Sequence, residues 1–286
     1  MHRLFLKAPR MHLDELLDSQ VALPSIPRIV AMVLTELNRE DPSLRSITQL
    51  INSDIGLATR LLGLANSAQF SFSHQIGSVG DALAVLGLNQ VRSLTVAAAM
   101  AGAFRSVPGL ELLEFWRYSL NVAKLSRTLA RSAASNPGVA FTAGLVHAAG
   151  ELVMHLGMPD QMRWLNERVE PLSPKRAKAE QHLLGYCYAQ VGAGFARSWG
   201  FPSEIVDAVE HQCTPFDDDR CEPLAGVLYL ASWRARAQEE KLTEVQIANS
   251  FPYDVAATLE IDIDEVLQRE PMNWTTNQES VDLFTG

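Results

Sequence analysis

The amino-acid sequence predicts an all-α protein. Apolar residues recur at steps of three and four along most of the chain, which places them on one face of a helix. The clearest such set is Ile26, Ile29, Val30, Val33, Leu34 and Leu37. No convincing segment alternates apolar and polar residues, and no Asn-Gly or Asp-Gly pair marks a hairpin. We therefore expect about a dozen helices or more, packed as two lobes.

Polar and glycine residues mark the helix ends in the first lobe. Asp54 precedes an apolar helix and can accept hydrogen bonds from its free backbone N–H groups. Ser78 and Asp81 resemble a capping box at the start of a short helix, and Gly87 is expected to end that helix. An alanine-rich helix over about 89–104 follows, and its small side chains suit a position in the core.

The segment Ser106-Val107-Pro108-Gly109 is the clearest break in the first half of the chain. It separates a first lobe, about residues 15–107, from a second lobe, about 110–240, and residues 241–286 form a C-terminal helical extension. Ser173 and Ser203 stand where they could cap helices. The helices expected after the break cover about 110–135, 139–156, 158–167, 174–184, 189–199, 203–211, 223–240, 254–259 and 264–270.

The charge of the chain disfavours nucleic acid as a partner. Lys and Arg number 24 against 33 Asp and Glu, a net charge of −9, whereas affinity for a phosphate backbone depends on Lys and Arg displacing counterions. Five basic residues form only a scattered patch, which we interpret as a solvated helical face. They are Arg163, Arg168, Lys175, Arg176 and Lys178.

The sequence also predicts a cytoplasmic location without a membrane partner. No apolar run approaches the roughly 18 residues that a membrane span needs, and the first ten residues lack the apolar core of a secretory signal. Cys187, Cys213 and Cys221 are odd in number and contain no Cys-x-x-Cys spacing. This pattern suits a reducing compartment better than a disulfide scaffold.

An ordered series of short motifs resembles the HDOD family of bacterial signal-transduction modules. The resemblance covers roughly residues 15–215, and the order of the motifs is more specific than any one of them. The motifs are Leu23-Pro24-Ser25-Ile26-Pro27, Asp54-Ile55-Gly56-Leu57, Leu61 to Ala68, Ser78 to Leu88, Phe115-Trp116, Gly144-Leu145-Val146-His147 and Trp199-Gly200-Phe201-Pro202. The resemblance implies a two-lobed all-α fold whose second lobe is related to the HD-type metal phosphohydrolases.

The resemblance also implies that the metal site of those enzymes is mostly absent. Their ligands are a histidine, an adjacent His-Asp pair and a later aspartate, which fix an ion that activates water and neutralises phosphate charge. Here the matching positions hold Tyr118, the pair His147-Ala148 and, less securely, Ser232. Cys187-Tyr188 stands where many relatives carry Asp-His. Only His147 remains of the expected ligands, so we expect no catalytic metal, no cofactor and no enzyme activity.

Other residue patterns offer weaker alternatives. His147, Glu151 and His155 are spaced by four and would share one helix face, but they span about 12 Å of helix, too far for one ion. A hydrogen-bonded set on the helix surface is the preferred interpretation. The spacing of Cys187, His211, Cys213 and Cys221 matches no zinc site. Tyr118 and Tyr188 either fill the volume that a metal left or offer their hydroxyls to a ligand.

The expected function is a non-catalytic, cytoplasmic regulatory module that acts through protein–protein contacts. Its partner would be a regulatory protein, for instance in two-component or cyclic-dinucleotide signalling. The alternative is a small-molecule or nucleotide sensor, and a phosphohydrolase with a rebuilt site, such as His147 with Glu151, is the least favoured. The residues expected around the vestigial pocket are Tyr118, His147, Ala148, Glu151, Cys187, Tyr188, His211 and Ser232.

Overall fold

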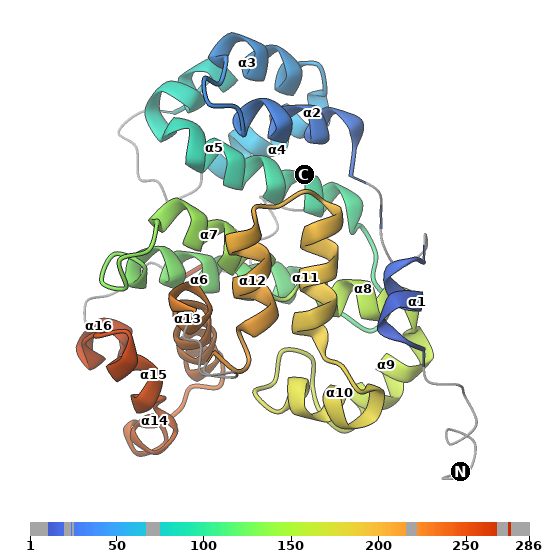
Figure 1. The fold of residues 1–286 in the computed structure, drawn as a ribbon, viewed down its shortest axis with the longest axis vertical. Helices are drawn as coiled ribbons and strands as arrows, with labels where there is room; N and C mark the ends of the chain where they lie inside the picture. Colours follow the sequence, from blue (N-terminus) through green and yellow to red (C-terminus); the bar gives the residue numbers. More distant parts are fainter. Residues whose placement is uncertain are drawn as a thin grey trace.

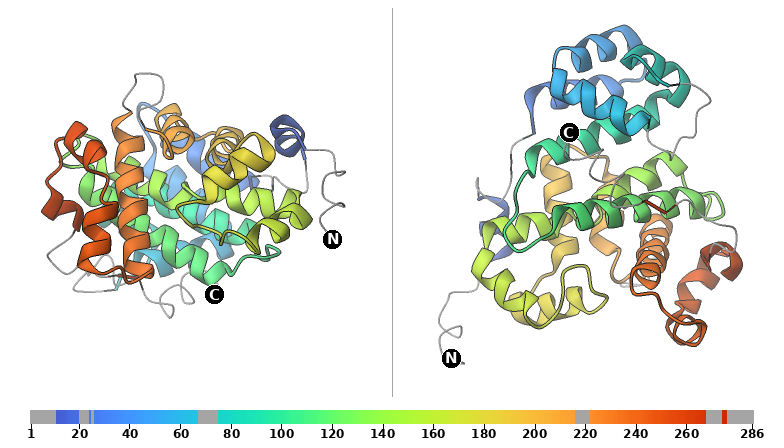
Figure 2. Two further views of the ribbon diagram at one scale, coloured as in Figure 1. Left: turned by 90° about the horizontal axis from the view of Figure 1, so that it is seen from below. Right: turned by 180° about the vertical axis from the view of Figure 1, so that it is seen from behind.

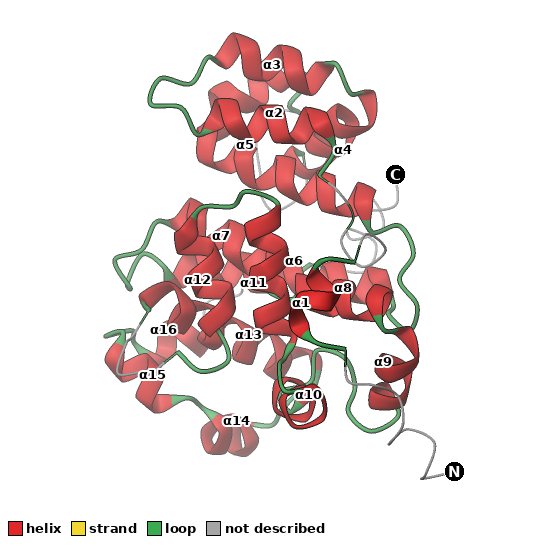
Figure 3. Cartoon of the chain, turned by 45° about the vertical axis from the view of Figure 1, so that its right-hand side comes forward, coloured by secondary structure: helices red, strands yellow, loops and turns green. Residues whose placement is uncertain are grey.

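The computed structural model describes residues 11–19, 24, 26–66, 75–215, 222–267 and 274–275. All the secondary structure in these residues is helical, and no strand occurs among them (Figure 3). The all-α class predicted from the apolar spacing is therefore confirmed.

Four helices form a first lobe, at the top of Figure 1. Asp54 caps the helix that begins at Ile55, as predicted, because its Oδ1 accepts a hydrogen bond from the backbone N–H of Leu57 at 3.0 Å. Ser78 Oγ likewise accepts from the N–H of Asp81 at 3.1 Å and donates to its carboxylate at 2.7 Å. The helices are α2 (Arg28–Leu37), α3 (Leu44–Asn52), α4 (Ile55–Ala65) and α5 (Val79–Ala103).

Helix α5 connects the two lobes. It is kinked at Gly87, whose φ of 77° interrupts the helix where we expected one helix to end and another to begin. The alanine-rich part after the kink is buried, as its small side chains suggested. It packs against the second lobe, where the Ser93 and Thr142 hydroxyls form a 2.5 Å hydrogen bond.

The second lobe lies below α5 in Figure 1 and contains most of the core. Helices α6 and α7 pack along each other, as the view from behind in Figure 2 shows, and α12 and α13 pack against them. Helix α11 in turn packs against α12 and α8. The helices are α6 (Leu112–Leu129), α7 (Pro137–Val146), α8 (Ala149–Gly157), α9 (Pro159–Asn166), α10 (Arg176–Leu184), α11 (Tyr188–Ser198), α12 (Ser203–His211) and α13 (Pro223–Glu239).

Three sequence expectations for the second lobe are wrong. The single helix expected over 139–156 is two helices, because the backbone leaves the helical region at Ala148 (φ −102°, ψ 10°). Ser203 is the first residue of α12 rather than its cap, since Pro202 occupies the cap position. Lys175, not Ser173, precedes α10.

Short helices at both ends of the chain pack on the second lobe. Helix α1 (Leu13–Leu17) lies against α11, and the Tyr186 hydroxyl donates to the Met11 carbonyl at 3.0 Å. At the other end, α14 (Glu244–Ser250), α15 (Tyr253–Thr258) and α16 (Ile263–Leu267) follow α13. A separate apolar cluster joins this extension to α6 and α13. Helix α14 was not expected from the sequence.

Two segments reach the length and mean hydropathy of a membrane span, contrary to the sequence expectation. They are residues 79–103, and residues 137–157, which comprise α7 and α8. Within their most apolar windows, 56% and 89% of the residues are buried inside the protein. Packing in the core of the two lobes accounts for their apolar composition.

Candidate functional site

Three of the expected pocket residues meet although they come from different helices. The Tyr118 ring on α6 lies 5.4 Å from the His147 ring, measured between centroids. The Tyr118 hydroxyl donates to the Ser232 carbonyl on α13 at 3.4 Å. Gln212, just after α12, donates from Nε2 to the His147 carbonyl at 2.8 Å. Tyr118, His147 and Ser232 are therefore neighbours in the fold.

The ionisable side chains at this meeting point are neutral at physiological pH. Burial lowers the pKa of His147 to about 3, although a hydrogen bond to the Gly144 carbonyl opposes the shift. That 2.7 Å bond involves Nδ1, and Nδ1 must donate it because a carbonyl only accepts. Burial also raises the pKa of the Tyr118 and Tyr188 phenols.

The donors at this site do not fit a divalent metal ion. A metal needs several deprotonated ligands, whereas Ala148 offers no side-chain donor and Ser232 offers a neutral hydroxyl. The guanidinium of Arg236 lies 5.9 Å from the centre of the Tyr118 ring and adds a positive charge instead. Within the part of the chain that the structure describes, no three His, Cys, Asp or Glu side chains gather as a metal site.

Glu151 and His155 belong to a separate buried cluster. Because the helix breaks after Val146, His147 does not continue the face that carries these two residues, so the expectation of one three-residue face is wrong. Glu151 and His155 contact each other at 3.5 Å and are fully buried rather than on a helix surface. The His155 Nδ1 donates to the Pro108 carbonyl in the segment between the lobes at 2.7 Å.

Arg176 holds this cluster together. Its Nε lies 3.1 Å from Glu151 Oε1 and 2.8 Å from Glu180 Oε1, and its Nη1 donates to the Val169 carbonyl at 2.7 Å. We expected Arg176 on a solvated face, but it is fully buried, because two carboxylates distant from each other in the sequence enclose it.

The two carboxylates around Arg176 have opposite pKa shifts. Burial and the charge of Glu151 raise the pKa of Glu180 well above 4.5. Burial also disfavours the charge of Glu151, but His155 and Arg176 outweigh it and lower the pKa. Glu180 Oε2 in turn accepts from the backbone N–H of Tyr188 at 2.8 Å. The cluster therefore fixes the start of α11, which carries Cys187 and Tyr188.

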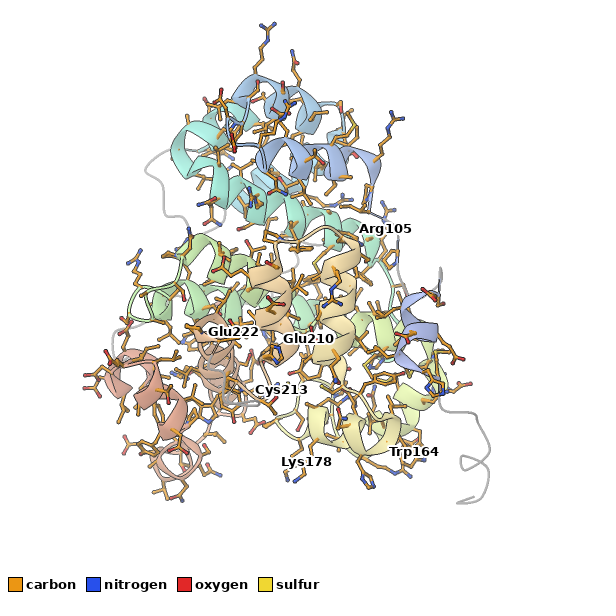
Figure 4. The ribbon with its side chains drawn as sticks, in the orientation of Figure 1. Arg105, Trp164, Lys178, Glu210, Cys213 and Glu222 are labelled. Carbon is orange, nitrogen blue, oxygen red and sulfur yellow. The ribbon has the colours of Figure 1, made fainter. Side chains whose placement is uncertain are left out.

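A cleft of about 920 Å³ opens beside the meeting point, between α10, α11, α12 and α13. Cys187, Tyr188, His211 and Ser232 line it, whereas Tyr118, His147, Ala148 and Glu151 do not. Figure 4 labels Lys178 on α10, Glu210 on α12 and Cys213 after α12, three further lining residues.

The sequence interpretation missed one central residue of the cleft, Arg236. It follows Ser232 by one helical turn, and this spacing was the only signal that could have identified it. Its Nε donates to the Leu172 carbonyl, and its guanidinium lies near both Tyr118 and Tyr188.

The two thiols of the cleft differ in acidity. A hydrogen bond from Cys213 lowers the pKa of Cys187 to about 7, against burial, and the backbone N–H groups of Ala189 and Gln190 at the start of α11 add to the effect. The same interaction with Cys187, together with burial, raises the pKa of Cys213 well above 9.0.

We expect iodoacetamide to alkylate Cys187 with a rate that rises through a midpoint near pH 7, because the thiolate is the reacting species. Cys213 should react appreciably only at a pH above 9.0. Peptide mass spectrometry after timed alkylation measures both rates, with Cys187→Ser as the control for site assignment. A midpoint for Cys187 near the ordinary thiol value would contradict the arrangement described.

Comparisons with known proteins place this fold in a family. The HDOD domain model matches residues 23–215. A crystal structure of a proposed phosphohydrolase from Shewanella amazonensis SB2B has 28% sequence identity and a TM-score of 0.77, over 94% of this chain and 98% of that one. A proposed signal transduction protein from Marinobacter aquaeolei VT8 shares the fold, with 23% identity and a TM-score of 0.69, over 91% of this chain and 57% of that one.

The uncharacterized protein YuxH of Bacillus subtilis (strain 168) is 25% identical over 154 residues. The match covers 54% of this chain but only 36% of YuxH, so the chain spans about a third of that relative's length. Since the HDOD model covers most of the sequence, the chain belongs to the HDOD domain family.

Proposed function

We propose that this chain is a non-catalytic regulatory module of bacterial signal transduction that acts in the cytoplasm through contacts with a regulatory protein. The observation that carries the proposal is the chemistry at the meeting point of α6, α7 and α13. A phenol, a neutral imidazole and a serine stand there, with a guanidinium beside them. This set lacks the anionic ligands that would hold an ion and lower the pKa of its water, so no phosphoester bond would be broken.

Elemental analysis tests the non-catalytic part of the proposal. We expect the native protein, purified without chelators, to carry less than about 0.1 divalent ions per chain and to leave bis(p-nitrophenyl) phosphate intact with added Mn²⁺. A Tyr118→His, Ala148→Asp, Ser232→Asp variant, checked for folding by circular dichroism, serves as the positive control and should gain an ion. A stoichiometric ion in the native protein, or hydrolysis by it, would overturn the proposal.

The contact part of the proposal is supported by exposed apolar side chains on the first lobe. Ile55, at the start of α4, is 82% exposed, and Leu44 on α3 is 52% exposed. A photo-crosslinking amino acid placed at Ile55 in cells of the source organism should capture one protein in preference to others. Equal, low capture from Ile55 and from the polar, exposed position Asp160 would count against a specific partner there.

A ligand sensor is the second candidate function, and one observation favours it. The cleft beside the vestigial site is open and lined by polar groups from four helices rather than filled by side chains. Pockets that bind small molecules have this form, with a few polar groups converging from a rigid scaffold. Binding of a ligand there would move α10, α11, α12 or α13 and so alter the surface offered to a partner.

A further inference from the structure

The positive charge of Arg236 lacks an anionic counterpart in the described part of the chain. Its side chain is half-buried and lines the cleft. Its described contacts are the Leu172 carbonyl, the Tyr118 ring and the Tyr188 side chain, all of them uncharged. No carboxylate in the described part of the chain forms an ion pair with Arg236, although that part contains eight ion pairs between other residues. A guanidinium withdrawn from water without an anion is costly, and a bound anion would offset that cost.

A second, independent observation comes from Ser232. It lies one turn before Arg236 on α13, so both side chains project from the same helix face into the cleft. Ser232 is only 6% exposed, and its Oγ has no hydrogen-bond partner among the described residues. Buried hydroxyls are nearly always paired. The free Oγ is therefore a ready donor beside the guanidinium.

The walls of the cleft add one cation, Lys178, and further ring nitrogens. Lys178 and His182 line it from α10 and His211 from α12. The acidic side chain among the lining residues, Glu210, is paired with Arg197 at 3.2 Å. In a chain of net charge −9, this is a local concentration of cationic and ionisable nitrogen groups, and low-dielectric walls strengthen the field that it creates.

We propose that this cleft binds a small organic phosphate, with its phosphoryl group held by Arg236 and Ser232. A phosphoryl group presents three oxygens and up to two charges, which matches donors from several directions better than a planar carboxylate does. The volume of about 920 Å³ is far larger than a phosphate ion, so room remains for the esterified group. Tyr229 and Trp233 lie on the same face of α13 and provide apolar surface for it.

This proposal rests on the second candidate function, and calorimetric titration of the full chain tests it. The probes are inorganic phosphate, phenyl phosphate and citrate. Each titration contains about 150 mM salt, because the short Debye length at that ionic strength screens nonspecific attraction between charges. We expect phosphate to bind, phenyl phosphate to bind more tightly and citrate to bind more weakly than either. Tighter binding of citrate, or weaker binding of phenyl phosphate than of phosphate, would overturn the assignment of an organic phosphate.

Matched variants locate the site. Arg236→Gln should weaken phosphate binding by about a hundredfold or more, because it removes the charge. Ser232→Ala removes a hydroxyl that has no partner in the free protein, so it should keep the fold and weaken binding by about tenfold. Arg163→Gln, which removes an exposed cation on α9, should leave affinity unchanged. Equal affinity in the native protein and in Ser232→Ala would refute the site.

The chain also carries Asp217, Asp218 and Asp219, outside the described residues. If their carboxylates neutralise Arg236, the native protein will not bind phosphate, whereas a variant with all three changed to Asn will bind it. That result would refute the proposal for the native chain.

Phosphate should also slow the alkylation of Cys187, which lines the cleft. Failure of this proposal leaves the metal content and hydrolysis results untouched, so the two proposals are distinguishable.

Discussion

Replacing Arg176 by methionine should lower the free energy of unfolding by about 3–5 kcal/mol, the usual cost of removing one partner from a buried ion cluster. Methionine has similar length but leaves Glu151 and Glu180 without their shared cation, and both carboxylates are fully buried. It also leaves the Val169 carbonyl without the N–H that Arg176 provides. Urea unfolding followed by circular dichroism measures the change.

Two variants serve as controls for Arg176→Met. Arg163→Met removes a cation whose side chain is 68% exposed and pairs with an equally exposed Asp160, so it should change stability by less than about 1 kcal/mol. Glu180→Gln should cost less than Arg176→Met, because burial and the charge of Glu151 already disfavour the ionised form of Glu180. A loss for Arg176→Met no larger than that for Arg163→Met would show that the cluster contributes nothing specific.

The pH dependence of stability gives the same cluster a second readout. An acid whose pKa is raised in the folded state binds more protons there than in the unfolded state, so stability falls as the pH rises above 4.5. Glu180→Gln removes that term. The stability of the variant relative to the native protein should therefore increase as the pH rises from about 5 to about 8. Both values lie above the ordinary carboxyl pKa of about 4.3. A parallel pH profile would contradict the raised pKa of Glu180.

Local signals explain which parts of the fold could be predicted. Asp54 and Ser78 act within four residues of their partners, so the sequence contains the whole interaction. The break between α7 and α8 at His147-Ala148 could not be predicted from such local interactions. Helix α7 is buried from Ala140 to Val146, so apolar residues occur on all its sides and the pattern runs through the break without a visible change.

The candidate site shows the same limit. The family resemblance pointed to Tyr118, His147 and Ser232, which lie on different helices and are neighbours only through the tertiary structure. The pair Arg176 and Glu180, four residues apart, looks like an ordinary surface pair in the sequence, because the second partner of Arg176, Glu151, is 25 residues away. The role of Arg236 is equally non-local, because the Leu172 carbonyl that it contacts is 64 residues away.

The start of α11 depends on a second contact, between the backbones of α8 and α11, and this contact requires glycine. A Cβ atom at Gly150 would lie 1.9 Å from the Tyr188 carbonyl oxygen and 2.7 Å from the Gly192 nitrogen. Both are backbone atoms, so no side-chain rotation relieves the overlap and the two helices must move apart. Gly150→Ala should therefore lower the free energy of unfolding by about 3 kcal/mol or more, at the upper end of the cost of overpacking.

Gly63, inside α4, provides the matched control, because a Cβ atom there meets nothing within 4 Å. Gly63→Ala should raise stability by about 0.5–1 kcal/mol, since alanine loses less backbone entropy in a helix. The two Gly-to-Ala changes thus have opposite expected signs in one urea-unfolding experiment. Displacement of Tyr188 should also disturb the neighbouring capping position, so Gly150→Ala alone should shift the pH midpoint of Cys187 alkylation. If Gly150→Ala is as stable as the native protein, α8 and α11 do not approach closely, and the start of α11 lacks the support on which the geometry of the cleft depends.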